Sequence, residues 1–208
     1  MTDPEEKLAD PTSQEVSRHL AGQLKSLRAT HGWSLDKAAL ATGVSKAMLG
    51  QIERGESSPT VATLWRIAKG FACPLSGFLS APPQATAEFV FRSAKLLRAK
   101  PARDDMLVAP LFPYDPRFAF ELLELSLLPG YVRSSEAHAA GVTEHVIVLS
   151  GAMEVLADGV WHELGEGDAV RFAADRPHGY RNLNEAPAVC HNLIHYPAGT
   201  ATPFPPEP

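Results

Sequence analysis

The sequence lacks the features that mark secreted and membrane proteins. It has only two cysteines, Cys73 and Cys190, in unrelated contexts, so no disulfide framework is expected and both thiols are predicted to be buried. No stretch approaches the roughly 18 consecutive apolar residues that a membrane span needs. The acidic and polar residues 1–15 are the opposite of the basic and then apolar pattern of a secretory signal. We therefore expect a cytoplasmic protein with no membrane partner.

The chain also lacks an overall excess of positive charge, but its charge is unevenly distributed. The net charge is -5, yet residues 16–80 hold eight lysines and arginines against three carboxylates, a balance of +5. Residues 1–15 and the residues from 81 onward are acidic. Because DNA phosphates attract cations and repel carboxylates, only the segment 16–80 is suited to meet nucleic acid.

The hydrophobic pattern divides the chain into a helical and a β-rich half. Over residues 16–80 apolar residues recur at helical spacing, between capping residues and glycines. Later runs alternate like strands of a barrel or sandwich, from AEFVF at 87–91 onward, with Asp158-Gly159 as a type I′ hairpin signal. The predicted fold class is multi-domain, α plus β, with a disordered leader (1–15), an all-α domain (16–80), a linker and first barrel strand (81–105), an all-β domain (106–197) and a tail (198–208).

Residues 35–54 have the spacing of a helix-turn-helix. The first helix, LDKAALAT, ends at Gly43, where the lack of a Cβ permits a sharp left-handed turn. Ser45 is then placed to cap the second helix. Because Leu49 and Ile52 are expected to pack inward, the opposite side of this second helix is left to enter the major groove of DNA.

The outward side of this helix supplies the candidate DNA contacts. Lys46 can donate to guanine, Gln51 can pair with adenine or meet a phosphate, and Ala47 can touch a thymine methyl group. Gly50 would allow close approach of the backbone. The residues expected to hold phosphates, and so to set register, are Ser45, Arg54, and Thr60 or Thr63. The alternative is a helical bundle whose exposed lysine and glutamine are only solvated.

The stretch LKSLRATHGWSLDKAALATGVSKAMLGQIERGESSPTVATLWRIAKGFACPLSGFL resembles the Cro/C1-type, or XRE-type, helix-turn-helix family. The resemblance implies a five-helix DNA-binding domain whose partner is a double-stranded DNA operator. Two residues depart from the family pattern. Ala38 stands where the family usually has leucine, which loosens packing, and Leu35 stands where it often has glutamine, which removes a phosphate contact.

The β-rich half carries a second constellation, in which His138, Glu144 and a later His178 are spaced among glycines. On the last strand of this set, His178, Tyr180 and Asn182 alternate toward one side. The spacing resembles the two cupin motifs and implies a double-stranded β-helix, or jelly-roll, barrel. The match is incomplete, because the positions of one histidine, one proline and one glycine of those motifs are taken by Ala140, Ala173 and Asp175.

The cupin resemblance implies a ligand set of His138, Glu144 and His178. Two histidines and one carboxylate suit one divalent transition metal, zinc, iron, nickel or manganese, and leave coordination positions open. The alternatives are a metal-free pocket in which the same residues hydrogen-bond an effector, and histidines satisfied by hydrogen bonds within the barrel. Tyr180 and Asn182 are the candidates for the effector pocket.

Taken together, residues 24–196 resemble helix-turn-helix–cupin regulators, in particular bacterial regulators of sulfur utilisation. The matching segments are GWSL, ATGVSKAMLGQIERGESSPTVATLWRIAKG, LFPYDP, EHVIVLSG, RFAAD and LIHYP. The resemblance implies a homodimeric, sequence-specific transcriptional regulator that is not an enzyme. Its cupin domain would sense a small metabolite linked to sulfur or amino-acid metabolism and modulate operator binding. The alternatives are a mononuclear metal enzyme, an oxygenase or epoxidase, with an appended helix-turn-helix, and a DNA-binding module whose barrel only dimerises it.

Overall fold

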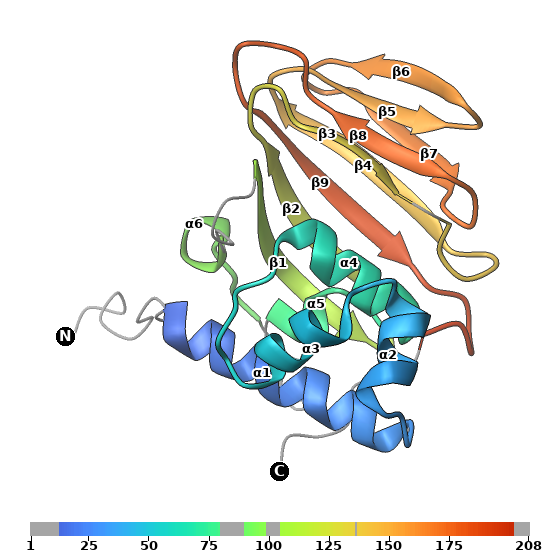
Figure 1. Cartoon of the computed structure of the whole chain (residues 1–208). Helices are drawn as coiled ribbons and strands as arrows, with labels where there is room; N and C mark the ends of the chain where they lie inside the picture. Colours follow the sequence, from blue (N-terminus) through green and yellow to red (C-terminus); the bar gives the residue numbers. More distant parts are fainter. Residues whose placement is uncertain (1–12, 80–89, 99–104, 136, 202–208) are drawn as a thin grey trace.

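A helical domain packs against one end of a two-sheet β domain (Figure 1). The computed structural model describes residues 13–79, 90–98, 105–135 and 137–201. The predicted leader up to residue 12 and most of the predicted linker and tail lie outside the described residues. Among the described residues, no helix combines the length and the hydropathy that crossing a membrane requires.

The helical domain contains the five helices that the family resemblance implies. The first begins three residues earlier than predicted, inside the segment assigned to the leader. A sixth short helix precedes the β domain. The helices are α1 (Ser13–Thr30), α2 (Leu35–Thr42), α3 (Lys46–Glu53), α4 (Val61–Gly70), α5 (Ser76–Leu79) and α6 (Ala94–Leu97).

Local signals in the sequence set the ends of α2, α3 and α4. The hydroxyls of Ser34, Ser45 and Thr60 each accept a hydrogen bond from the backbone N–H three residues later, at 3.1–3.2 Å. Gly43 ends α2 in the left-handed conformation, with φ 65°. These caps satisfy backbone groups that a short helix leaves without partners, so the turn between α2 and α3 is fixed locally.

Two tertiary contacts fix the orientation of the helices. The guanidinium of Arg28 in α1 binds both carboxylate oxygens of Glu53 in α3, at 2.6 and 2.9 Å, and also donates to the carbonyl of Trp33. A Cβ on Gly70 of α4 would lie 2.7 Å from Thr42 of α2. Because only glycine fits there, α4 lies in direct backbone contact with the helix-turn-helix.

The β domain is a sandwich of two antiparallel sheets, as the cupin resemblance implies. One sheet has the strand order β1-β2-β9-β4-β7 and the other β3-β8-β5-β6. Asp158 and Gly159, both at positive φ, form the predicted tight turn between β5 and β6. The strands are β1 (Met106–Asp115), β2 (Phe120–Leu127), β3 (Val132–Ser135), β4 (Thr143–Ser150), β5 (Met153–Ala157), β6 (Val160–Leu164), β7 (Ala169–Ala173), β8 (His178–Arg181) and β9 (Ala188–His195).

The predicted first strand, at 87–91, is wrong for the part that the structure describes. Val90 and Phe91 are not in a strand, and residues 87–89 lie outside the described residues. The first strand of the sandwich is β1, which begins at Met106 and forms the edge of the five-stranded sheet. An alternating apolar run is a weak signal by itself, because strand formation depends on the tertiary contacts of the segment.

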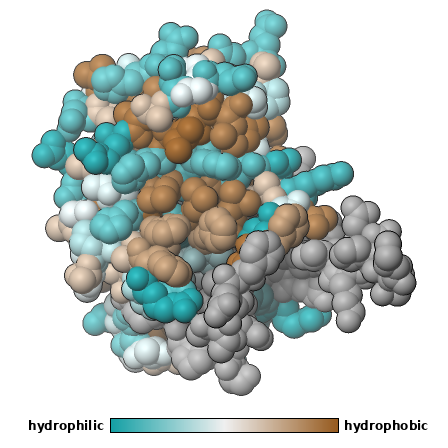
Figure 2. Space-filling view, turned by 180° about the vertical axis from the view of Figure 1, so that it is seen from behind, coloured by the Kyte–Doolittle hydropathy of each residue, from teal (hydrophilic) through white to brown (hydrophobic). Residues whose placement is uncertain are grey.

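The outer face of the five-stranded sheet is unusually apolar. Along β4, Val146 and Val148 are buried in the sandwich, whereas Ile147 and Leu149 point outward and are 44% and 39% exposed. Phe112 on β1 is 40% exposed. Figure 2 shows apolar side chains gathered over the middle of the face that lies behind the view of Figure 1. A band of polar side chains separates two apolar areas in this view, and exposed apolar areas of this kind are typical of an interaction face (Figure 2).

The two cysteine side chains are buried and free, as the sequence predicts. Burial among apolar side chains raises the pKa of Cys190 to about 12. Neither thiol is therefore suited to redox or metal chemistry at neutral pH.

A buried carboxylate joins the two domains. Glu121 on β2 is 0% exposed and accepts hydrogen bonds from the backbone N–H groups of Leu75, at 3.3 Å, and Ser76, at 2.8 Å, at the start of α5. The hydroxyl of Tyr196 donates to the same carboxylate at 2.6 Å. Burial raises the pKa of Glu121, although these donors oppose the shift. The backbone N–H of Tyr114 on β1 also donates to the hydroxyl of Ser76, at 2.9 Å.

Replacing Glu121 with alanine is expected to weaken the docking of the helical domain. Two backbone amides and the Tyr196 hydroxyl would lose their acceptor inside a buried interface, at a cost of about 1–3 kcal/mol for each group left unsatisfied. Calorimetry should show a lower unfolding midpoint and a separate transition for the helical domain. Glu163→Ala, which removes an exposed carboxylate of β6, is the control, and equal midpoints for the two variants would contradict this role.

Candidate nucleic-acid interface and metal centre

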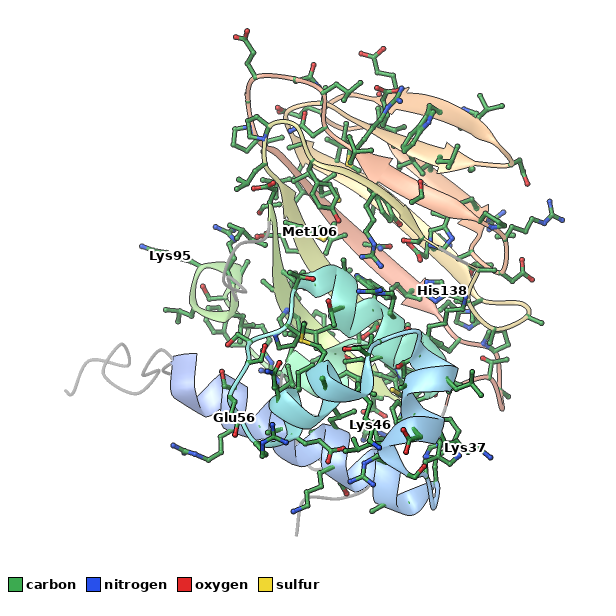
Figure 3. The ribbon with its side chains drawn as sticks, in the orientation of Figure 1. Lys37, Lys46, Glu56, Lys95, Met106 and His138 are labelled. Carbon is green, nitrogen blue, oxygen red and sulfur yellow. The ribbon has the colours of Figure 1, made fainter. Side chains whose placement is uncertain are left out.

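Helix α3 presents a continuous polar stripe to solvent. Leu49 and Ile52 are 0% exposed and anchor the helix in the core. Five of the predicted DNA contacts lie on the exposed side: Ser45, Lys46, Ala47, Gln51 and Arg54. Figure 3 shows Lys46 on the part of the helical domain away from the β domain, and His138 in the β domain, on the side that faces the helices. The stripe is therefore accessible to a duplex while the β domain stays clear.

Gly50 does not belong to this stripe. It is buried, and a Cβ at this position would lie 3.1 Å from Nη1 of Arg54 and 3.9 Å from Cδ1 of Leu35. The prediction that Gly50 faces the groove is wrong for this structure, because the side chains of Arg54 and Leu35 cover it. Leu35, which departs from the family pattern, is used here for packing.

The two threonines at the start of α4 differ in accessibility. Thr63 is 8% exposed, and its hydroxyl lies 3.0 Å from the hydroxyl of Thr60. Thr60 is half-buried and caps the helix. Of the two alternatives for a phosphate contact, Thr60 is the more accessible.

Surface carboxylates already hold two cations of the stripe. The ammonium of Lys46 lies 2.8 Å from a carboxylate oxygen of Asp36, and both side chains are mostly exposed. The guanidinium of Arg54 binds both oxygens of Glu56, at 2.8 and 2.7 Å, and this contact lowers the pKa of Glu56. Exposed ion pairs contribute little to stability, so DNA phosphates can displace these carboxylates. A phosphate that met Lys46 or Arg54 would therefore have to replace a carboxylate of the protein.

The predicted metal ligands meet inside the β domain. His138 precedes β4, Glu144 lies on β4 and His178 begins β8, and their ligand atoms all lie within 4.8 Å of one another. Nε2 of His138 is 2.9 Å and Nε2 of His178 is 3.3 Å from Oε1 of Glu144. Both Glu144 and His178 are almost completely buried. One carboxylate oxygen and two imidazole nitrogens thus converge on a single point.

A second layer of hydrogen bonds orients these ligands. Nδ1 of His178 lies 2.8 Å from the carbonyl of Arg176, so the other ring nitrogen, Nε2, is the one that faces Glu144. The hydroxyl of Tyr180 and the amide of Asn192, the latter at 2.9 Å, donate to Oε2 of Glu144. Oε1 is therefore left for the histidines.

The charge of Glu144 is stabilised by the two histidines. Burial by itself raises the pKa of this carboxyl, but the hydrogen bonds and charges of His138 and His178 outweigh burial and hold the pKa well below its ordinary value. For His178 the two effects have the opposite signs. Burial by itself lowers the pKa of this imidazole, but the hydrogen bond and charge of Glu144 outweigh burial and raise the pKa above its ordinary value. The carboxylate is ionised at neutral pH, as a metal ligand must be.

The donor set fits a divalent transition metal. Two imidazoles and one ionised carboxylate, each with an oriented partner, match the ligands of zinc, iron, nickel or manganese sites. Ala140 is exposed, and among the described residues no further histidine joins His138, Glu144 and His178. When bound, such a metal would supply open coordination positions to a small molecule.

A cavity of about 250 Å³ opens beside these ligands. Tyr180 lines it, as predicted for the effector pocket. The lining residues of the β domain are Met106, Leu125, Arg133, Ser134, Ser135, His138, Glu144, His178 and Tyr180, and those of α4 are Ala62, Trp65, Arg66 and Lys69. The cavity is therefore enclosed by both domains.

Asn182 lies outside this cavity, so its prediction as a pocket residue is wrong for this structure. Its side chain is fully buried and donates to the carbonyls of Leu127, at 3.0 Å, and Ala186, at 2.8 Å. Its amide oxygen accepts from the backbone N–H of Asn184. The amide is used to hold a loop, and it is Asn192 of β9 that reaches Glu144.

Comparisons with known proteins match both the helical domain and the β domain. A family model described as "Helix-turn-helix" matches residues 24–78, and one described as "Cupin domain" matches residues 123–196. The HTH-type transcriptional regulator SutR of Escherichia coli K12 is 48% identical over 184 residues, which cover 88% of this chain and 98% of SutR. The chain belongs to the family of helix-turn-helix transcriptional regulators with a cupin domain. The predicted family and fold class are thus confirmed.

A solved structure supports the same assignment for the regulator. The crystal structure of an HTH_3 family transcriptional regulator from Vibrio cholerae has 45% sequence identity and a TM-score of 0.75. The match covers 89% of this chain and 99% of that one. The arrangement of both domains is therefore shared with this relative.

Removing a predicted ligand should abolish metal binding. Removing a hydrogen-bond partner of a metal ligand typically lowers metal affinity by roughly 10- to 100-fold. We expect His178→Ala, which removes a ligand itself, to lower the affinity for zinc or iron by more than this. The measurement is elemental analysis of protein purified without chelator, followed by metal titration. His195→Ala, an exposed histidine of β9, is the control. Equal metal content in the two variants would contradict the assignment of His178.

Proposed function

We propose that the protein is a homodimeric regulator that binds a specific DNA operator and adjusts this binding when its cupin domain takes up a small metabolite. The observation that carries the proposal is the position of α4. This helix is in backbone contact with the helix-turn-helix through Gly70 and also forms a wall of the ligand cavity. A change at the cavity can thus reach the DNA-reading surface through one rigid element.

The polar stripe on α3 supports a direct reading of bases. In this proposal Lys46 donates to guanine, Gln51 pairs with adenine and Ala47 touches a thymine methyl group. Ser45, Arg54 and Thr60 hold phosphates on either side and set the register. The positive balance of residues 16–80 draws this domain, rather than the acidic β domain, to the duplex.

The cupin domain supplies the sensor in this proposal. His138, Glu144 and His178 hold a divalent metal or bind the effector directly, and Tyr180 closes the same pocket. The effector belongs to sulfur or amino-acid metabolism, as the resemblance to bacterial regulators of sulfur utilisation implies. An effector regulates only if it binds the two DNA-binding states with different affinity.

An enzymatic role is the second candidate, because a two-histidine, one-carboxylate set also occurs in metal oxygenases. The hydroxyl of Tyr180, which lines the cavity, already donates a hydrogen bond to Glu144. Burial also raises the pKa of Tyr180 well above its ordinary value. It is therefore a poor proton donor or acceptor. Aerobic turnover of a candidate substrate by the iron-loaded protein would favour the enzyme.

The experiment that tests the regulatory proposal is operator binding across a salt series. A duplex selected from a random pool is titrated with the protein, with and without candidate sulfur metabolites. We expect tight, salt-dependent binding that one metabolite changes. Absent or salt-insensitive binding would overturn the proposal.

Two substitutions on α3 should separate base reading from phosphate binding. Gln51→Ala is expected to cost about 1–3 kcal/mol on the selected operator and to leave non-specific binding unchanged. Arg54→Ala should weaken binding to all duplexes and reduce the salt slope by about one. Lys25→Ala, which removes an exposed cation of α1, is the control. Equal losses on selected and random DNA for Gln51→Ala would show that it reads no base.

The apolar outer face of the five-stranded sheet is the proposed dimer interface. Ile147→Glu should convert the protein to a monomer in sedimentation analysis and weaken operator binding, because a charge would be buried against the partner copy. Val160→Glu places the same charge at an exposed apolar position of β6 in the other sheet. If Ile147→Glu forms dimers as stable as those of the parent protein, the dimer interface lies on another surface.

A further inference from the structure

Trp65 of α4 forms the boundary between the two domains at the cavity. Its ring centroid lies 5.5 Å from that of His138, and the guanidinium carbon of Arg133 lies 5.3 Å from the Trp65 ring centroid. Figure 3 shows His138 beside α4. A residue of the DNA-binding domain thus contacts both a predicted metal ligand and a cation of the barrel.

The cavity walls carry an excess of positive charge. Arg66 and Lys69 come from α4 and Arg133 from β3, whereas Glu144 is the one carboxylate among the described lining residues. The charge of Glu144 is already engaged by the two histidines. Among the described residues, no carboxylate lies within ion-pair distance of Arg66 or Arg133, although the charge of Glu144 acts on Arg133 from across the cavity wall. Arg66 is exposed and Arg133 is half-buried, so an anion that enters the cavity can reach both guanidinium groups and form charge-assisted hydrogen bonds with them.

The remaining walls define the rest of the ligand. Trp65, Met106 and Leu125 offer apolar surface, and Ser134 and Ser135 lie beside them. The cavity of about 250 Å³ falls just below the range of roughly 300–1,000 Å³ usual for ligand pockets. The size and the mixture of walls suit a molecule of few carbon atoms with an anionic group at one end.

We propose that the cavity binds a small organic anion across both domains, with the anionic group held by Arg133 of the barrel and Arg66 of α4. The carbon skeleton lies against Trp65. Guanidinium groups suit carboxylate, sulfonate and phosphate alike, since each offers paired oxygens. This inference rests on the proposed function for its regulatory meaning, because it names the ligand class of the same sensor.

The consequence for regulation is a direct one. An anion shared by Arg66 and Arg133 ties α4 to the barrel, and the residue that caps the start of α4 is Thr60, one of the proposed phosphate contacts. A helix of ten residues is about 15 Å long, so the ligand and the phosphate-binding end are joined by a single rigid rod. The ligand therefore fixes the angle of the DNA-binding domain on the barrel.

Tryptophan fluorescence provides the test. In the full-length Trp33→Phe/Trp161→Phe protein, emission reports Trp65 alone. The probes are propanoate, 1-propanesulfonate and propyl phosphate, with propanamide as the neutral isostere, each titrated with and without chelator. We expect a saturable change with at least one anion, unaffected by chelator, and none with propanamide at the same concentrations. The tightest of the three anions identifies the ligand's anionic group.

Arginine variants test which domain holds the anion. Arg66→Met and Arg133→Met should each weaken anion binding by about 10- to 100-fold, since each removes a charge-assisted contact and keeps the apolar stem. Arg171→Met, an exposed arginine of β7, should bind as the parent does.

Three results would overturn the inference. These are no binding of any probe, equal binding of propanamide, and full affinity in Arg66→Met together with loss in Arg133→Met. The last result would confine the ligand to the barrel. Operator binding in the salt series is measured independently, so failure of the anion site remains distinguishable from failure of the regulatory proposal.

Discussion

The arrangement of the two domains depends on the buried carboxylate of Glu121. A carboxylate taken out of water is unfavourable unless donors surround it, and here the donors come from the start of α5 and from Tyr196 of the β domain. These partners exist together only when the domains are docked. The same docking places α4 beside the barrel, where it forms one wall of the cavity. A second buried carboxylate, Glu144, organises the interior of the cavity in the same way.

The parts of the structure that could be predicted from the sequence are those set by neighbours along the chain. The ends of α2, α3 and α4 follow from Ser34, Ser45 and Thr60, whose hydroxyls act within one helical turn. The exposed stripe on α3 follows from helical periodicity. The ligand set followed from resemblance to a family, since residues 138, 144 and 178 are too far apart for local reasoning to join them.

The parts that could not be predicted depend on contacts between distant segments. Gly50 lies on the expected side of α3, but the long side chain of Arg54 folds over it. Asn182 alternates correctly with Tyr180, yet the loop after β8 takes up its amide. Asn192 could have been found, because it faces opposite to His191 on its strand, but only once the inward face of that strand was known. The contribution of α4 to the cavity has no sequence signal, because it depends on how the two domains dock.

The carboxylates of Asp36 and Glu56 have a consequence for how the regulator finds its site. A duplex that offers only phosphates replaces one anion beside Lys46 or Arg54 with another, at small net gain. A duplex that also offers matching bases gains further contacts once the exchange is made. In the proposed function, the protein's own surface anions would shorten the residence time on random DNA and would leave more of the protein free to search for its operator.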